Sequence, residues 1–124
     1  MAYAGVIATE AALNAMAGEN VDATGWVADN KDLWIKQAEA FLNLLVRYDV
    51  VTNWASLTAN YKAIFTEYGS RYCAVAGILY NTAGFTNLIE AEDMVTYHIY
   101  RMQRIEELLR DVNVVKDIGV DVGA

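Results

Sequence analysis

The chain has 124 residues, of which 56% are apolar, and its 16 acidic and nine basic side chains give a net charge of −7. This length builds one hydrophobic core, and the apolar share exceeds what a monomer of this size needs, which favours self-association. The scattered Lys and Arg residues argue against a nucleic-acid-binding surface, which needs clustered cations. No apolar run reaches the roughly 18 residues of a membrane span, and no basic region precedes an apolar one. We therefore expect a soluble protein without a secretory signal.

The first expected element is a brief helix from Glu10 to Ala17. Thr9 is a plausible N-cap for it, and Gly18 closes it. Residues 19–28 mix Gly, Asn, Asp and Thr, which predicts a loop. Trp26 in this loop either anchors it against the body of the protein or packs on the loop itself, and the sequence favours neither.

A core helix is expected next, capped by Asp29 or Asn30 and running to about Tyr48. Large apolar residues recur at helical spacing and form its main face: Trp34, Ala38, Phe41, Leu45 and Tyr48. A narrow polar ridge marks the side expected to face water: Lys36, Glu39, Asn43 and Arg47.

The stretch from Thr52 to Thr82 predicts one long helix, capped by Thr52 or Asn53 and ended at Gly84. Its large apolar residues share one side: Trp54, Leu57, Tyr61, Ile64, Phe65, Tyr68, Tyr72, Val75 and Leu79. Small residues share the other side, where another backbone can come close: Ala59, Ala63, Thr66, Ser70, Ala74, Gly77 and Asn81. We expect this helix to be covered on both faces.

A last helix is expected from Asn87 to about Asp111, because Asn87 and Glu90 have the spacing of a capping box. Its apolar stripe would pair with the long helix in an antiparallel hairpin: Leu88, Ala91, Val95, Ile99, Met102, Ile105 and Leu109. The opposite, outer face contains Asp93, Tyr97, Tyr100, Arg104, Glu107, Leu108 and Asp111. Tyr and Arg are enriched at protein interfaces, so this face is either an intersubunit contact or a solvated face with two snorkelling tyrosines.

Residues 112–124 are expected to form an extended tail. Ile118, Val120 and Val122 alternate with Gly119 and Asp121, which is a strand-like pattern without a partner strand in the chain. Such a tail can order by adding to a sheet edge of a partner. The sequence therefore predicts an all-α fold, with a small bundle built on a long hairpin over residues 1–111 and the tail beyond it.

The side-chain inventory offers no catalytic, cofactor or metal site, and we expect no enzyme. His98 is the only histidine and lies on or beside the apolar stripe of the last helix, which favours a structural role. Cys73 is the only cysteine, so it forms no internal disulfide, and an inert buried thiol is expected. Glycine-rich nucleotide-binding loops are absent from the sequence.

Three segments carry a family resemblance: Tyr80-Asn81-Thr82-Ala83-Gly84-Phe85-Thr86, Ile89-Glu90-Ala91-Glu92-Asp93-Met94 and Arg101-Met102-Gln103-Arg104-Ile105-Glu106. With them the chain resembles the small helical head-to-tail connector, or adaptor, proteins of tailed bacteriophages. The resemblance implies a structural protein of the virion neck, made in the host cytoplasm, that forms a twelvefold ring between the portal and the tail. DNA would pass nearby without specific binding.

The resemblance also implies where the partners bind. Neighbouring subunits, the portal and the tail or neck proteins would contact a set of interface residues on the last helix and the tail: Tyr97, Tyr100, Arg101, Arg104, Ile118, Val120 and Val122. The alternative is a helical homodimeric accessory or regulatory protein that binds a protein partner.

Overall fold

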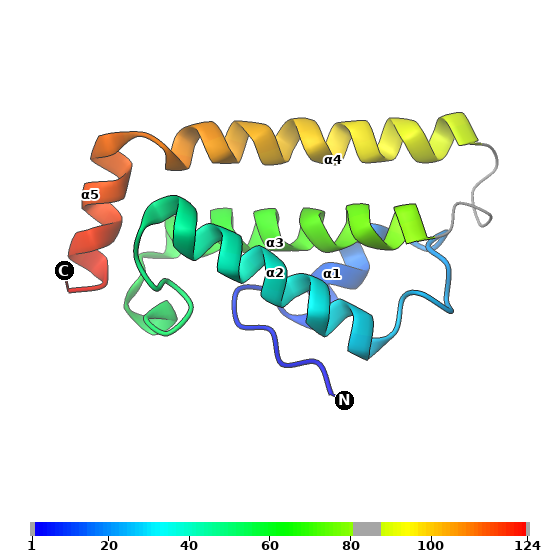
Figure 1. Ribbon diagram of the computed structural model, residues 1–124, viewed down its shortest axis with the longest axis horizontal. Coiled ribbons are helices and arrows are strands. Elements are labelled where there is room, and N and C mark those ends of the chain that lie inside the picture. Colours follow the sequence, from blue (N-terminus) through cyan, green and yellow to red (C-terminus); the bar gives the residue numbers. More distant parts are fainter. Residues whose placement is uncertain (1, 81–87, 124) are drawn as a thin grey trace.

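The computed structural model describes residues 2–80 and 88–123, and within these ranges the fold is all-α (Figure 1). It consists of α1 (Glu10–Ala17), α2 (Ala28–Val46), the short 3-10 helix η1 (Trp54–Ser56), α3 (Ala59–Tyr80), α4 (Leu88–Leu109) and α5 (Val112–Asp121). The all-α class predicted from the sequence is confirmed. None of the described helices is long and apolar enough to cross a membrane.

Helix α3 lies at the centre of the molecule. Helix α4 runs antiparallel beside it, while α1 and α2 pack against it from other sides, and α5 turns across the end of the α3–α4 pair (Figure 1). The main core contains fully buried side chains from each of α1 to α5 and from the segments that precede α1 and α3: Ile7, Leu13, Ile35, Ala38, Leu42, Val46, Val50, Phe65, Cys73, Leu109 and Ile118 are among them. One continuous core of this kind is what a chain of this length supports.

Helix α1 has the predicted bounds and caps. The Thr9 side chain accepts a hydrogen bond from the Ala12 N–H at 3.2 Å, and Gly18 follows the helix with a φ of 80°. The loop behind it is anchored by Trp26, whose Nε1 donates to the Asn14 side chain at 2.8 Å. The Trp26 ring also lies against Gly77 of α3, where an added Cβ would stand 2.5 Å from it. The anchoring role of Trp26 is therefore confirmed, and Gly77 makes room for it.

Helix α2 differs from expectation in its cap and in its polar ridge. It starts after Val27, which makes no side-chain cap, so neither Asp29 nor Asn30 is the N-cap. Glu39 was expected to face water but is only 7% exposed. Its carboxylate accepts hydrogen bonds from the backbone N–H groups of Val6 at 2.6 Å and Ile7 at 3.1 Å. A buried carboxylate is tolerable when donors satisfy it, and here the extended N-terminal segment supplies them.

The long central helix is shorter than predicted. It begins at Ala59 instead of Thr52, because the chain between α2 and α3 folds into a compact turn around Asp49. The Asp49 carboxylate accepts hydrogen bonds from the Thr52 N–H at 3.0 Å and the Thr52 hydroxyl at 2.7 Å. Trp54 consequently lies in η1, and its ring packs 6.3 Å from that of Phe65. The predicted stop at Thr82–Gly84 and the predicted cap at Asn87 lie outside the described residues.

The prediction of an extended C-terminal tail is wrong, because residues 112–121 form helix α5. Asp111 caps it by accepting a hydrogen bond from the Asn113 N–H at 2.8 Å. Val114, Ile118 and Val122 recur at four-residue intervals, and all three pack on the main core. The sequence of this segment fits both a helix, with apolar residues four apart, and a strand, with apolar residues two apart. The helix forms because it buries these side chains against the core.

Two hydrogen bonds fix α5 to the start of α3. The Tyr61 hydroxyl donates to the Asp117 carboxylate at 2.5 Å, and this bond, with burial, raises the pKa of Tyr61 to about 12. The Asp121 carboxylate accepts from the Thr58 N–H at 3.0 Å. The C-terminal segment is thus part of the folded body.

Candidate protein-interaction surface

Helix α4 has one buried side and one exposed side. Within residues 89–109, whose side chains the structure describes, the buried residues are Ala91, His98, Ile105 and Leu109, which follow one another at intervals of seven, seven and four residues. This seam lies against α3 because residues seven apart return to the same side after two turns. The predicted stripe is thus confirmed at Ala91, Ile105 and Leu109, and His98, which was expected on or beside the stripe, is buried within it.

The exposed side of α4, called the α4 outer face below, carries large apolar and aromatic side chains. Ile89 is 68% exposed, Tyr97 57%, Tyr100 56% and Leu108 46%. Arg104 is exposed between them. Four large side chains share one face of this 22-residue helix, and Tyr and Arg are common at interface centres, so the face has the composition of a protein-binding surface.

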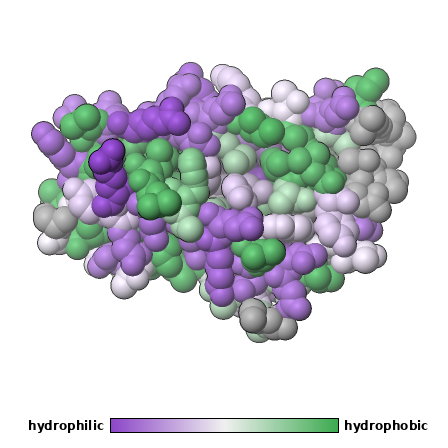
Figure 2. All heavy atoms as spheres, in the orientation of Figure 1, coloured by the Kyte–Doolittle hydropathy of each residue, from purple (hydrophilic) through white to green (hydrophobic). Residues whose placement is uncertain are grey.

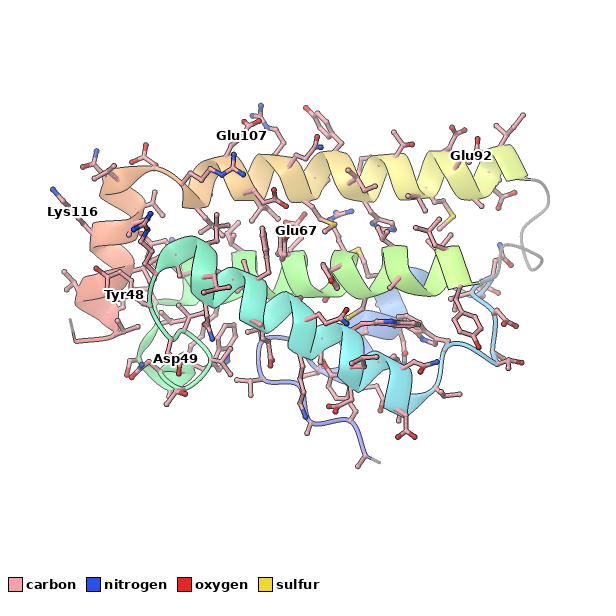
Figure 3. The ribbon with its side chains drawn as sticks, viewed as in Figure 1. Tyr48, Asp49, Glu67, Glu92, Glu107 and Lys116 are labelled. Carbon is pink, nitrogen blue, oxygen red and sulfur yellow. The ribbon has the colours of Figure 1, made fainter. Side chains whose placement is uncertain are left out.

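Arg101 differs from its neighbours because it is bound within the molecule. Its guanidinium contacts the Glu67 carboxylate of α3 through two hydrogen bonds, of 3.0 Å and 3.1 Å. Arg71 of α3 contacts the same carboxylate at 2.8 Å. Partial burial alone would raise the pKa of Glu67, but the bonds from Arg101 and Arg71 outweigh it and lower the pKa. Arg101 therefore ties α4 to α3, which limits its use in a contact with another protein. Figure 3 shows its partner Glu67 between α3 and α4.

His98 sits at the inner edge of this cluster. Arg71 donates a hydrogen bond from Nη1 to His98 Nδ1 at 3.0 Å, so the ring is neutral with its proton on Nε2. Burial lowers the pKa of His98, and the Arg71 cation lowers it further. The Arg71 guanidinium also lies over the Tyr97 ring, 5.1 Å from its centre, and makes a cation–π contact with it.

Cys73 is fully buried, as predicted. Burial, and to a lesser degree the charge of Glu39, raises the pKa of its thiol to about 12. A thiol with that pKa is almost entirely protonated at neutral pH and is a poor nucleophile. Within residues 2–80 and 88–123, no group of three or more potential metal ligands converges.

An apolar groove runs beside the α4 outer face, between α2, α3 and α4. It is lined by Trp34, Gln37, Tyr72, Val75, Ala76, Ile99 and Met102. Ile99 was assigned to the hairpin seam but is 39% exposed and borders this groove. Figure 2 shows hydrophobic side chains gathered between α3 and α4 toward the start of α4. The sequence did not reveal the groove, because its lining residues come from three helices that are separate in the sequence.

The three C-terminal interface residues occupy different environments. Ile118 is fully buried in the core, Val122 is half-buried and packs on the core, and Val120 is 73% exposed. Folding as a helix places Val120 on the side opposite Ile118. Of these three residues, Val120 alone is freely accessible to a partner.

The chain matches no family model, no curated protein and no solved structure.

Proposed function

We propose that this protein is a structural subunit of a tailed-phage virion, of the head-to-tail connector type. Copies of the chain would form a ring between portal and tail, and DNA would pass through the ring without specific binding. The observation that carries the proposal is the α4 outer face, where Ile89, Tyr97, Tyr100 and Leu108 are exposed along one helix. Such a face supports binding to other proteins, and the connector assignment itself rests on the sequence resemblance.

Two further observations support an assembly role. The chain carries a net charge of −7, so its surface does not retain DNA that passes by. Cys73 and His98 are both buried in structural surroundings, which favours a function without nucleophilic or acid–base chemistry. We propose accordingly that the protein is not an enzyme.

The test is assembly of the purified chain, alone and with candidate portal rings, followed by mass photometry and negative-stain imaging. We expect ring-shaped complexes. Replacing Tyr97→Ala together with Arg104→Ala should abolish them while the circular dichroism spectrum of the helices is kept, because both side chains are exposed. Leu33→Ala is the control, since Leu33 is 55% exposed and belongs to α2, not to the α4 outer face.

Two results would contradict the proposal. A rigid monomer that binds no virion component would remove its basis. A stable dimer that ignores portal and tail proteins would instead favour the alternative, a helical homodimeric accessory or regulatory protein. Loss of helical signal in the Tyr97 and Arg104 variant would show that these residues belong to the core, and the assay would then be repeated with Tyr100→Ala.

A further inference from the structure

A hollow of about 570 Å³ lies at the end of the molecule where α2 meets α5, and we call it the basic pocket. Every charged side chain that lines it is a cation: its residues are Leu44, Leu45, Arg47, Arg110, Val112, Val115 and Lys116. The apolar part is accessible, because Leu44 is 81% and Val112 65% exposed. Hydrophobic and strongly hydrophilic side chains adjoin one another at this end of the molecule (Figure 2).

The three cations of the basic pocket are unusual in so acidic a chain. They are three of its nine basic residues, and none of them forms an ion pair within the described part of the chain. Asp49, Asp111, Asp117 and Asp121 lie close to these cations in the sequence or on the same helix and keep their negative charge, but their carboxylates accept hydrogen bonds from Thr52, Asn113, Tyr61 and Thr58, and none of them lines the pocket. The pocket therefore offers positive charge and apolar surface that the fold itself does not use.

Arg47 adds an independent reason to think that the pocket has a use. It ends α2 in the left-handed conformation, with a φ of 67°, and no other described non-glycine residue has a positive φ. Glycine fits this position without steric cost, whereas an arginine there is strained. Strain kept at a surface position points to a side chain that is needed.

The opposite end of the molecule has the complementary character. The first turns of α4 present Ile89, Glu92 and Asp93, which are exposed and share one face at three- and four-residue spacing. Glu92 and Asp93 form no ion pair with another described residue, and neither Lys nor Arg occurs between Ile89 and Tyr100. We call these three residues the acidic tip. Figure 3 shows Glu92 and Lys116 at opposite ends of the molecule.

We propose that the basic pocket of one copy receives the acidic tip of the next copy. Glu92 and Asp93 would pair with Arg47, Arg110 and Lys116, while Ile89 would cover the exposed Leu44 and Val112. The contact is head to tail, because the two surfaces differ and lie at opposite ends, so repeated copies form a ring or a filament. The charges set the direction of the contact, and the inference rests on the self-assembly proposed above.

The test is a charge exchange measured by analytical ultracentrifugation. The pocket variant carries Arg110→Glu and Lys116→Glu, and the tip variant carries Glu92→Lys and Asp93→Lys. Each variant alone places like charges together and should weaken self-association roughly tenfold or more. The chain with all four substitutions should regain association to within about threefold of the unchanged protein, because the complementary pairs are restored with reversed sign. An equimolar mixture of the two variants should associate for the same reason.

Failure of this contact is distinguishable from failure of the proposed function. If the unchanged chain assembles and neither variant weakens assembly, the acidic tip and basic pocket do not meet, although self-assembly stands. If both variants weaken assembly but neither the chain with all four substitutions nor the mixture restores it, the acidic tip does not bind the basic pocket. A chain that stays monomeric at every concentration would overturn both proposals.

Arg47→Gly gives a second measurement that a purely structural role would not reproduce. Because glycine relieves the left-handed strain, the thermal unfolding midpoint of the dilute chain should stay the same or rise. Self-association should nevertheless weaken about threefold or more, because one of the three cations is lost. Unchanged association of Arg47→Gly, with a folded chain, would remove Arg47 from the contact and argue against it.

Discussion

The two longest helices of this protein, α3 and α4, are equal in length but differ in how their residues are used. Helix α3 has buried residues around most of its circumference, with Phe65 and Tyr68 on one side and Ser70, Ala74 and Gly77 on another. Helix α4 buries one narrow seam and exposes large side chains opposite it. Equal length and similar apolar content thus lead to one helix that organises the fold and one that presents a surface.

We therefore expect mutations in α3 to affect folding and mutations on the exposed side of α4 to affect binding. A side chain surrounded on all sides loses many contacts when it is shortened, whereas an exposed one loses few. A large-to-small substitution on each helix can break this contrast between α3 and α4. Substitutions at Gly77 and Gly69 sharpen it on α3, and the titration of His98 sharpens it on the buried side of α4.

The largest effect is expected for Phe65→Ala in α3. Phe65 is fully buried and packs against Trp54, so the substitution should lower the free energy of unfolding by about 3–5 kcal/mol. Tyr100→Ala on the α4 outer face is the matched control and should change it by about 0.5 kcal/mol or less. Urea unfolding of dilute protein measures both. Similar losses for the two variants would show that α3 and α4 do not differ as described.

A smaller effect is expected for Gly77→Ala. Alanine favours a helix by about 1 kcal/mol over glycine, but its Cβ would lie 2.5 Å and 2.6 Å from atoms of the rigid Trp26 ring. The overpacking should outweigh the propensity gain and leave a net loss of about 1–2 kcal/mol by thermal unfolding.

Gly69→Ala is the control for Gly77, because its nearest neighbours are the flexible ends of Ile7 and Ile35, at 2.7 Å and 2.8 Å. These methyl groups can rotate away, so Gly69→Ala should cost less than Gly77→Ala. The reverse order would mean that Trp26 is not held firmly against α3.

The smallest effect is expected from His98, through pH. Because burial and Arg71 lower the pKa of His98 in the folded state, the unfolded chain binds more protons just below pH of about 6.5. Stability should therefore fall as the pH drops below that value, until the folded-state pKa is passed. NMR titration of this single histidine should give a pKa below about 6.5, and His98→Gln should flatten the pH dependence. A pKa above that of a free histidine would exclude the assigned hydrogen bond from Arg71.

Parts of the fold could be predicted because local chemistry decides them. Thr9 and Gly18 set the bounds of α1, since an N-cap hydroxyl and a left-handed glycine act within one turn of helix. The small side of α3 indicated close packing, and Gly77 does admit the Trp26 ring. The exposure of Tyr97 and Tyr100 also followed from their spacing against the apolar seam.

Other features could not be predicted because they depend on partners distant in sequence. Glu39 looked like a surface residue until the N-terminal segment supplied its N–H donors from 33 residues away. Arg101 looked free until Glu67, 34 residues away, was placed opposite it. The start of α3 was misplaced because the hydrogen bonds around Asp49 compete with the helical pattern of residues 52–58.

The sequence by itself determined that this protein is all-α, acidic, and built around a long helix with small residues on one side. Helical spacing and charge are local properties, so they can be read from the order of the residues without knowledge of the fold. Only the tertiary structure decided that the C-terminal segment is a helix, because Ile118 gains burial in the core that no extended tail would give it. The same packing brings Arg110 and Lys116 beside Arg47, and cations so far apart in the sequence meet only once the chain is folded.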